Sequence, residues 1–464
     1  MTAPKSHLHF MGIGGVSMSG LARHHHAAGH RVSGCDGADS ETVRALRAEG
    51  IDVRLGHDGA HLAGVDALVT SAAIATDAPE RLEAERLGLP IRRRIDLLAD
   101  LFRAYRAIGV TGTHGKSTTS GMVATILLEH GDDPAVQLGA TLPALHGVMR
   151  YGRGAHLVAE VDESDPGFAQ LEADVAVVTN LEDDHIAGEH DERRTYHASL
   201  RDLETATRRY AAQARTLVAC ADWTGLDDLF ADHPDRVRYG EAAHADYRIE
   251  ELRLHPDRSR FTVRGPDGSA EVRLEVPGRH NALNATAALA AADRAGVPLA
   301  DGAEALATFA GVGRRWQRWG EVGGALVIDD YAHHPTEVAA TLEAARATGR
   351  RVRAVLQPHR WIRTARHWPA LADAAAAADE VLVLDVFGAG EARVPGVSSE
   401  RIVQRLRDGG HAASHHDHES AGRYLAASLL DGDLVITLGA GDVWRVAQTL
   451  VASGGDRSPA SDAP

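Results

Sequence analysis

The chain has 464 residues, of which 44% are apolar and 5% aromatic, a composition typical of a globular protein rich in small residues. Its 65 acidic and 49 basic residues give a net charge of −16, which argues against a general nucleic-acid or membrane-surface role. No stretch approaches the roughly 18 apolar residues of a membrane span, and no export signal is evident, so we expect a cytoplasmic protein. The length allows about three domains.

The first predicted domain spans residues 1–105 and has a Rossmann-like α/β pattern. Apolar strands are predicted over 7–13, 30–36 and 65–74, and a helix over 16–29 separates the first two. This alternation of strand and helix predicts a parallel sheet with crossover helices.

The turn after the first strand contains the glycines of a diphosphate-binding loop. Gly12, Gly14 and Gly15 lie there, but Ser17 occupies the third glycine position of the dinucleotide fingerprint. Asp36, at the end of the next strand, stands where a ribose-binding acid is found. The pattern predicts a diphosphate site without saying which nucleotide it takes; simple helix–strand packing is the alternative.

Three consecutive histidines at 24–26 and two cysteines are further candidates for metal binding. The histidines have no partners at metal-motif spacing, and Cys35 and Cys220 lie outside any metal or redox spacing. We therefore expect the histidines on a solvated helix face. We expect no disulfide framework, as is usual in a reducing compartment.

The second predicted domain, residues 106–311, opens with "GVTGTHGKSTT" at 109–119, which has the order strand, glycine loop, helix. Such loops offer backbone amides and a helix N-terminus to phosphate oxygens. The usual pattern has glycine five residues before the Gly-Lys pair, where Val110 stands here. Lys116 is one of only two lysines among 49 basic residues, which favours a role that needs a compact ammonium. We predict nucleotide binding, with Ser117 as a Mg²⁺ ligand.

Two further strands of this domain end in acidic residues. "VAEVDESD" provides Glu160, Asp162, Glu163 and Asp165, and "VVTNLEDDH" provides Asn180, Asp183, Asp184 and His185. The carboxyl ends of parallel strands meet at one edge of a sheet, and Mg²⁺ prefers oxygen ligands. Beside a phosphate loop, these residues predict a metal site rather than solvated turns. Antiparallel strands are predicted over 245–277 and a helix over 278–296.

The third predicted domain, residues 312–452, is a second Rossmann-like domain, followed by a disordered tail over 453–464. Four buried strands are predicted in it, at 324–330, 351–357, 380–386 and 433–439. "DDYAHHPTE" at 329–337 places Tyr331 and His333 at a strand-to-helix turn. In "QPHRWIRTARHW", Arg360 and Arg363 lie close together, a pairing that suits a carboxylate or a phosphate; a solvated basic helix start is the alternative.

The ordered motifs "GIGG", "GTHGKST", "EVDESD", "TNLEDDH", "GRHNALNA", "GRRW", "DDYAHHPTE" and "QPHR" resemble those of the Mur ligases, most closely the alanine-adding branch of that family. The resemblance runs from about residue 7 to residue 445. It implies three α/β domains: a UDP-sugar-binding domain, a central P-loop-type ATPase domain with a mostly parallel sheet, and an amino-acid-binding domain.

The resemblance also assigns roles to residues. It implies that UDP-N-acetylmuramate is bound by Gly12, Gly14, Gly15, Asp36 and Ser71. It implies that ATP is bound by Gly112, Thr113, His114, Gly115, Lys116, Ser117 and Thr118, with Asn281, Asn284, Arg315 and Asp330. Magnesium would be held by Ser117, Glu160 and His185. L-Alanine would be held by Tyr331, His333, Arg360 and Arg363. Lys116, His185, Arg360 and Arg363 are the implied catalytic residues, with His185 as a metal ligand rather than a base.

The implied reaction passes the γ-phosphoryl group of ATP to the muramate carboxylate, and the amine of L-alanine then attacks the acyl phosphate. Three departures from the family pattern stand out. Ser117 replaces a more usual Thr, Trp316 replaces Phe, and "RTAR" differs from "RTRD", which leaves Arg366 out of the predicted site. Several sister ligases carry a carbamylated lysine, and apart from Lys5 and Lys116 this sequence has no lysine that could take that role.

Three other functions remain as alternatives from the sequence. Within the family, a ligase that recycles a tripeptide is the nearest. Outside it, "GIGG" and Asp36 are compatible with an NAD(P)-dependent oxidoreductase, and the phosphate loop with a regulatory NTP-binding protein. Neither of these two accounts for Lys116 together with both acidic strand ends. The oligomeric state is left between monomer and dimer.

Overall fold

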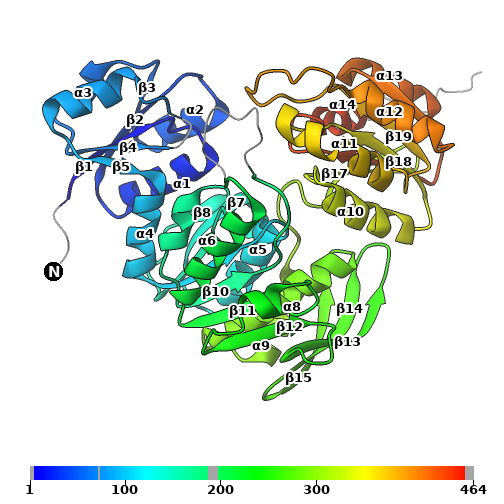
Figure 1. Cartoon of the computed structure of the whole chain (residues 1–464), viewed down its shortest axis with the longest axis horizontal. Helices are drawn as coiled ribbons and strands as arrows, with labels where there is room; N and C mark the ends of the chain where they lie inside the picture. The colour runs from blue at the N-terminus through cyan, green and yellow to red at the C-terminus, as the bar shows by residue number, and fades with distance from the viewer. Residues whose placement is uncertain (1–4, 72–73, 187–196, 455–464) are drawn as a thin grey trace, which may run out of the picture.

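The computed structural model describes residues 5–71, 74–186 and 197–454, and within these residues the backbone forms three α/β domains, each built on its own sheet. The N-terminal domain (blue) and the C-terminal domain (yellow to red) lie on the same side of the central domain (Figure 1). No helix of the described residues is long and apolar enough to cross a membrane.

The N-terminal sheet is parallel throughout, in the order β3-β2-β1-β4-β5. Its strands are β1 (His7–Met11), β2 (Arg31–Asp36), β3 (Asp52–Leu55), β4 (Ala67–Thr70) and β5 (Ile91–Arg93). Its helices are α1 (Val16–Ala27), α2 (Glu41–Ala48), the short 3₁₀ helix η1 (Gly59–Leu62), α3 (Pro79–Leu87) and α4 (Arg94–Ala104). Helix α1 also packs on β7 and β8 of the central domain, where Gln137 Nε2 donates to Ser17 O at 3.1 Å.

The central sheet runs in the order β15-β14-β13-β12-β11-β10-β6-β9-β7-β8. Its strands are β6 (Arg106–Thr111), β7 (Ala135–Leu142), β8 (Gly147–Arg150), β9 (His156–Glu160), β10 (Val175–Val178), β11 (Thr216–Cys220), β12 (Arg236–Gly240), β13 (Tyr247–Leu254), β14 (Ser259–Gly265) and β15 (Gly268–Leu274). Its helices are α5 (Lys116–Glu129), η2 (Pro143–Leu145), η3 (Pro166–Gln170), α6 (Leu200–Ala212), α7 (Leu226–Leu229), α8 (Arg279–Arg294), α9 (Leu299–Ala305) and η4 (Leu306–Thr308). Strand β6 lies between β9 and β10 and is parallel to both, so the carboxyl ends of all three meet.

Helix α8 packs against α5 and buries most of its alanines, which let the two backbones approach closely. It ends at Arg294, and Gly296 follows with φ 106°, a left-handed conformation that glycine adopts without strain. The predicted antiparallel excursion over 245–277 is present as β13–β15, three strands that extend the parallel sheet.

The C-terminal sheet has the order β16-β17-β21-β18-β19-β20. Its strands are β16 (Gln317–Val322), β17 (Ala325–Asp330), β18 (Arg351–Leu356), β19 (Glu380–Leu384), β20 (Ala413–His416) and β21 (Asp433–Leu438). Its helices are α10 (Pro335–Ala347), α11 (Trp361–Ala375), α12 (Ser399–Asp408), α13 (His418–Ser428) and α14 (Trp444–Gly454). The four predicted strands are β17, β18, β19 and β21, and the less buried edge strands β16 and β20 are additional.

Two predictions need correction. The tail predicted from residue 453 starts too early, because helix α14 continues to Gly454; residues 455–464 lie outside the described part. The expectation that all three histidines are solvated is wrong for His24, which is 5% exposed and packs edge-on against Tyr105 and Tyr151. Burial lowers the pKa of His24 to about 4, so its ring is neutral. Tyr151 belongs to the next domain, so domain docking supplies one of the two tyrosines that cover this ring.

Candidate active site

The predicted phosphate loop connects β6 to α5 and is fixed to the end of β10. The amides of Thr113 and His114 donate to Asn180 O at 3.1 Å and Asn180 Oδ1 at 2.8 Å. Gly112 has φ 127°, and a Cβ there would lie 2.2 Å from Thr179 Oγ1, so only glycine fits. Val110 lies inside β6 and pairs with both neighbouring strands. Its position is therefore in a regular strand, where the backbone conformation does not require glycine.

Lys116 turns back over its own loop. Its Nζ donates to Gly112 O at 2.6 Å and Thr113 O at 3.1 Å, and lies 2.8 Å from Glu163 Oε2. Burial alone would lower the pKa of Lys116, but Glu163 and two further carboxylates raise it above its ordinary value. The ammonium is therefore charged, and it can exchange the loop carbonyls for phosphate oxygens.

The acidic strand ends lie beside this ammonium. Glu163 is fully buried, and burial raises its pKa to about 7. Glu160, at the end of β9, accepts a hydrogen bond from Gly139 N at 2.8 Å. His185 Nε2 lies 3.7 Å from Glu163 Oε1, and burial lowers the pKa of His185 to about 4. A neutral imidazole suits metal ligation better than proton abstraction near neutral pH.

A pocket of about 360 Å³ lies between the central and C-terminal domains. It is lined by Asp183, Asp184, His185, Ile186, Arg360, Ile362, Arg363, Arg366, His367 and Glu391. Arg363 binds Asp184 with two parallel hydrogen bonds, from Nε at 2.9 Å and Nη2 at 3.1 Å. Arg360 lies 3.2 Å from a carboxylate oxygen of Glu391. Two predicted arginines and His185 thus share one pocket.

Arg366, which was left out of the predicted site, also lines this pocket. Its Nη2 donates to both carboxylate oxygens of Asp183 at 2.7 Å. The difference between "RTAR" and "RTRD" had left this position out, and its contact forms only when helix α11 meets the segment after β10.

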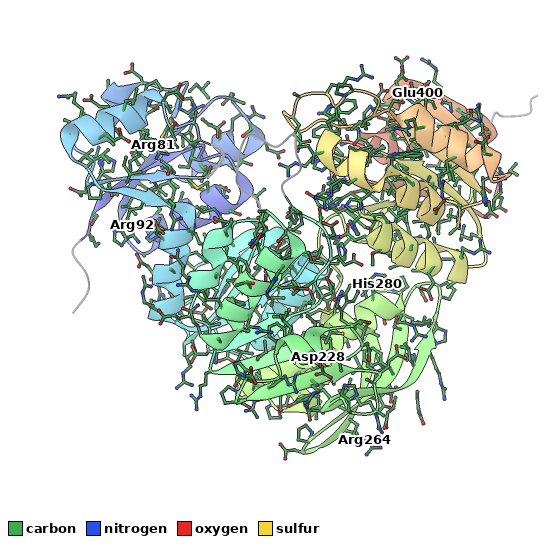
Figure 2. The ribbon with its side chains drawn as sticks, viewed as in Figure 1. Arg81, Arg92, Asp228, Arg264, His280 and Glu400 are labelled. Carbon is green, nitrogen blue, oxygen red and sulfur yellow. The ribbon has the colours of Figure 1, made fainter. Side chains whose placement is uncertain are left out.

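A larger cavity, about 840 Å³, lies next to the phosphate loop. Its lining includes the predicted residues His114, Gly115, Thr118, Asn281, Asn284, Arg315 and Asp330. It also includes Trp223, Tyr239, His280, Leu283 and Trp316, which give it a largely aromatic wall. Figure 2 labels His280 where the central domain meets the C-terminal domain. A pocket with aromatic lining next to the amides of a glycine loop fits the base and phosphates of a nucleotide.

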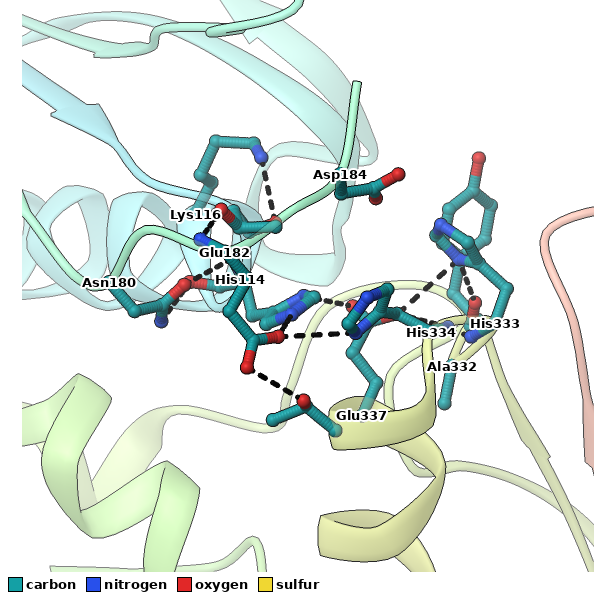
Figure 3. Close-up of polar contacts among 12 residues, drawn as sticks. His114, Lys116, Asn180, Glu182, Asp184, Ala332, His333, His334 and Glu337 are labelled. Carbon is teal, nitrogen blue, oxygen red and sulfur yellow. Dashed lines mark hydrogen bonds and ion pairs between the residues drawn. The ribbon is translucent and has the colours of Figure 1, made fainter. Parts of the chain in front are cut away.

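A cluster of ionisable side chains joins the two domains beside the loop (Figure 3). His114 Nε2 lies 2.7 Å from Glu182 Oε2, and His114 Nδ1 lies 3.4 Å from Glu337 Oε1. Glu182 also accepts from Thr336 Oγ1 at 2.9 Å and pairs with His334 at 3.2 Å. Burial alone would lower the pKa of His114, but Glu337 and Glu182 raise it to about 9.

The turn after β17 places Tyr331 beside two arginines. The guanidinium carbons of Arg314 and Arg315 each lie 5.0 Å from the centre of the Tyr331 ring. Asp330 accepts from Trp316 N and Ala332 N, each at 2.8 Å, and burial raises its pKa to about 6.

His333 lies on this turn as well. Its Nδ1 is 2.9 Å from Tyr331 O, and burial lowers its pKa to about 3. Four non-glycine residues at or beside the two pockets have left-handed backbones, namely His185, Arg314, Trp316 and Arg360. Strained backbone of this kind concentrates at functional sites.

The predicted diphosphate residues lie apart from both pockets, in the N-terminal domain. Gly12 has φ 64°, and Gly15 N donates to Gly12 O at 3.1 Å, which closes the turn before α1. Asp36 Oδ2 accepts from Gly14 N at 2.9 Å, so this acid helps to shape the loop. Ser71 follows directly after β4, whose carboxyl end lies beside that of β1.

Three family models match the chain: the Mur ligase family catalytic domain over residues 7–106, the Mur ligase middle domain over 110–292, and the Mur ligase glutamate ligase domain over 314–441. The chain is 44% identical over 457 residues to UDP-N-acetylmuramate–L-alanine ligase of Deinococcus radiodurans, covering 97% of this chain and 94% of that protein. The chain belongs to the Mur ligase family. It is therefore an ATP-dependent ligase.

Solved structures agree with this placement among the Mur ligases. UDP-N-acetylmuramate-alanine ligase of Thermotoga maritima superposes with a TM-score of 0.83 at 28% identity, covering 98% of this chain and 100% of that chain. A murein peptide ligase of Psychrobacter arcticus superposes with a TM-score of 0.69 at 24% identity, covering 98% and 99%, which shows a shared fold. The predicted resemblance and the three-domain α/β fold are confirmed.

The Mur ligase family implies magnesium beside the nucleotide, and the residues present fit that ion. Ser117 is 7% exposed at the start of α5, and Glu160 ends the strand next to β6. Glu163 adds a fully buried carboxylate, and burial raises its pKa to about 7. Oxygen donors of this kind suit Mg²⁺, and neutral His185 adds a ring nitrogen. These residues would hold the ion.

Sequence reasoning missed several residues that line the larger cavity or the domain junction: Trp223, Tyr239, His280, Glu182 and Glu337. Glu182 and Glu337 lie inside the motifs "TNLEDDH" and "DDYAHHPTE", so their position was a usable signal. Trp223 and Tyr239 follow β11 and end β12, in segments without any motif, and only the fold brings them to the cavity.

Proposed function

We propose that this chain joins L-alanine to the lactyl carboxylate of UDP-N-acetylmuramate in peptidoglycan synthesis, using ATP and Mg²⁺ and forming ADP and phosphate. The observation that supports the proposal best is the convergence at one domain junction of the phosphate loop, the acidic strand ends and the arginine-lined pocket. The 44% identical relative carries the corresponding name over nearly its full length.

The reaction has two steps in this proposal. The muramate carboxylate attacks the γ-phosphorus of ATP, ADP leaves, and an acyl phosphate results. The neutral amine of L-alanine then attacks the acyl carbon, phosphate leaves, and the nitrogen loses one proton. Bound Mg²⁺ would neutralise the charge of the phosphate oxygens. Lys116 and the loop amides provide further positive potential for the transferred group, which is the main catalytic contribution expected in phosphoryl transfer.

In this proposal each domain contributes to the binding of a different ligand. We assign the UDP-sugar to the glycine turn of Gly12–Gly15 with Asp36 and Ser71. We assign the adenine to the aromatic cavity around His280. The carboxylate of L-alanine is assigned to Arg360 and Arg363, with Tyr331 and His333 beside its side chain. Arg363 would then exchange part of its contact with Asp184 for the substrate carboxylate. A cytoplasmic location and a monomeric or dimeric state stay predictions.

Phosphate release with a panel of acceptors tests the proposal. We expect turnover only when ATP, UDP-N-acetylmuramate and L-alanine are all present, and none with the tripeptide in place of L-alanine. Equal release without the sugar nucleotide would indicate a simple NTPase. Release that requires the tripeptide would instead favour the recycling ligase. The murein peptide ligase structure superposes on this chain with a lower TM-score than the alanine ligase structure does.

A further inference from the structure

A cluster of metal-binding side chains lies in the N-terminal domain, away from the two pockets described above. His9 comes from β1, Cys35 from β2, His61 from η1 and Glu80 from the first turn of α3. One ligand atom of each lies within 4.8 Å of those of the other three. His9 is 1% exposed, and Cys35 and Glu80 are fully buried. Four separate elements contribute, so no sequence spacing could reveal the cluster.

The two carboxylate oxygens of Glu80 differ in their hydrogen-bond partners. Oε1 lies 3.1 Å from Cys35 Sγ, 3.1 Å from His61 Nδ1 and 3.3 Å from His57 Nδ1. It also accepts from Asp58 N at 3.0 Å. Glu80 Oε2 and His9 Nε2 are buried and have no hydrogen-bond partner among the residues that the structure describes. Leaving such atoms unsatisfied is costly, and a cation bound within the cluster would satisfy both.

The imidazole ring of His9 is oriented by a hydrogen bond at Nδ1, the ring nitrogen that faces away from the cluster. Its Nδ1 lies 2.9 Å from Ser33 Oγ, and that oxygen lies 2.8 Å from His7 Nε2. His7 Nδ1 in turn lies 2.8 Å from Gly64 O. This chain of hydrogen bonds fixes the orientation of the His9 ring and leaves Nε2 for the cluster. Metal-bound histidines are usually oriented by hydrogen bonds at the other ring nitrogen in this way.

We propose that His9, Cys35, His61 and Glu80 bind one transition-metal ion of the zinc class. One sulfur, two imidazole nitrogens and one carboxylate oxygen form a donor set suited to Zn²⁺, whereas Mg²⁺ and Ca²⁺ prefer oxygen ligands throughout. A thiolate and a carboxylate together balance the ion's two positive charges, so the buried site is neutral overall. Binding releases the Cys35 thiol proton to solvent.

His57 offers a route into the site. Its side chain is 35% exposed, and its Nδ1 lies 3.5 Å from Cys35 Sγ. An ion can exchange a bound water for the His57 imidazole before it reaches His9, Cys35, His61 and Glu80. The four protein ligands fill a tetrahedral shell and leave no position for a substrate, which is the pattern of a structural site.

The position of the site gives it a role in the N-terminal domain. Cys35 O accepts from Ile13 N at 3.1 Å, and the next residue, Asp36, accepts from Gly14 N. A metal that fixes Cys35 therefore also fixes the glycine turn before α1. It ties η1 and α3 to the sheet as well, so loss of the metal loosens this face of the domain first.

Cobalt titration of the full chain, stripped of metal with a chelator, tests the proposal. Co²⁺ bound by a thiolate in tetrahedral geometry gives visible bands and a sulfur-to-cobalt charge-transfer band. The chain has two cysteines, and both are buried and free. We expect one Co²⁺ per chain with both features, displaced by one Zn²⁺, and the same spectrum in Cys220→Ser. Cys220 is the matched control because it lies in β11 of the central domain.

Two variants complete the experiment. Cys35→Ser should lose the charge-transfer band, and His61→Ala should weaken Zn²⁺ binding by about tenfold or more while the chain stays folded by circular dichroism. If Cys35→Ser does not fold, the spectrum of Cys220→Ser alone assigns the thiolate, since one cysteine remains. Absence of the charge-transfer band in the unaltered chain overturns the proposal. So does Co²⁺ bound only without a thiolate, which would point to the predicted magnesium residues Ser117, Glu160 and His185 or to the group His114, Glu182 and His334.

Discussion

Replacing Lys116 by Met tests how the charges of the phosphate loop are balanced. Lys116 Nζ lies 2.8 Å from Glu163 Oε2, and Glu163 is fully buried. Breaking a buried ion pair usually costs about 3–5 kcal/mol, because the remaining charge is stranded. Here burial already raises the pKa of Glu163 to about 7, and loss of the ammonium raises that pKa further. We therefore expect Glu163 to take up a proton near pH 7, which limits the destabilisation there.

The same reasoning makes the destabilisation depend on pH. When the pKa of a carboxyl is higher in the folded chain than in the unfolded chain, the free energy of unfolding falls as pH rises between the two pKa values. For the unaltered chain this window runs from the unfolded value of 4.5 to about 7. For Lys116→Met the window extends to higher pH. The free energy of unfolding of the variant should thus fall by about 1.4 kcal/mol more than that of the unaltered chain for each pH unit above 7, until the pH reaches the new pKa of Glu163.

Urea unfolding of the central domain at pH 7, 8 and 9 measures this difference. The unaltered chain, Lys116→Met and the double variant Lys116→Met/Glu163→Gln are compared at each pH, so other titrations cancel. We expect the extra pH dependence in the single variant and its absence in the double variant. Parallel curves for Lys116→Met and the unaltered chain between pH 7 and 9 would refute the reasoning about Glu163.

Activity separates the catalytic role of Lys116 from its effect on stability. Phosphate release should fall by about 10²–10³-fold or more in both the single and the double variant, because each lacks the cation that faces the transferred group. Lys116→Arg should fail as well, since a planar guanidinium cannot reproduce the compact ammonium over the loop. Turnover preserved in any of these variants would show that the loop does not hold the phosphates.

Three further predictions concern neighbouring residues. Gly112→Ala should abolish ATP binding, whereas Gly131→Ala, at a similar positive φ but with no atom within 4 Å of the added Cβ, should keep it; calorimetry decides. Arg363→Lys should raise the KM for L-alanine by about tenfold or more and leave that for ATP unchanged; an equal change in both KM values contradicts the assignment. The raised pKa of His114 gives stability that is complete below pH 6.5 and lost as pH rises through about 9; thermal unfolding of His114→Gln should lack that loss.

The sequence predicted the local parts of this molecule well. The strand, glycine loop and helix around Lys116 depend on residues within eleven positions, and the buried strands of the C-terminal domain are continuous apolar runs. Both signals are local, so the structure reproduces them. The edge strands β16 and β20 were missed because their side chains are half exposed and carry no such run.

What the sequence could not predict depends on segments that meet only after folding. Trp223, which follows β11, and Tyr239, in β12, line the larger cavity although they are far along the chain from the loop. His24 packs against Tyr151 of another domain as well as against Tyr105. Cys35 lacked metal spacing in the sequence because its potential partners are on three other elements. In each case a tertiary contact, rather than a local pattern, determines the environment of the side chain.

The three consecutive acids after β10 contact two helices of the C-terminal domain, Glu182 on α10 and Asp183 and Asp184 on α11. Glu182 contacts Thr336, Asp183 contacts Arg366, and Asp184 contacts Arg363. Because the acids are neighbours in one short segment, the C-terminal domain cannot slide past them and keep some contacts while losing others. Opening has to break these contacts as a block. Any separation of the two domains at this junction therefore has to break an ion pair of Asp183, an ion pair of Asp184 and a hydrogen bond of Glu182 together.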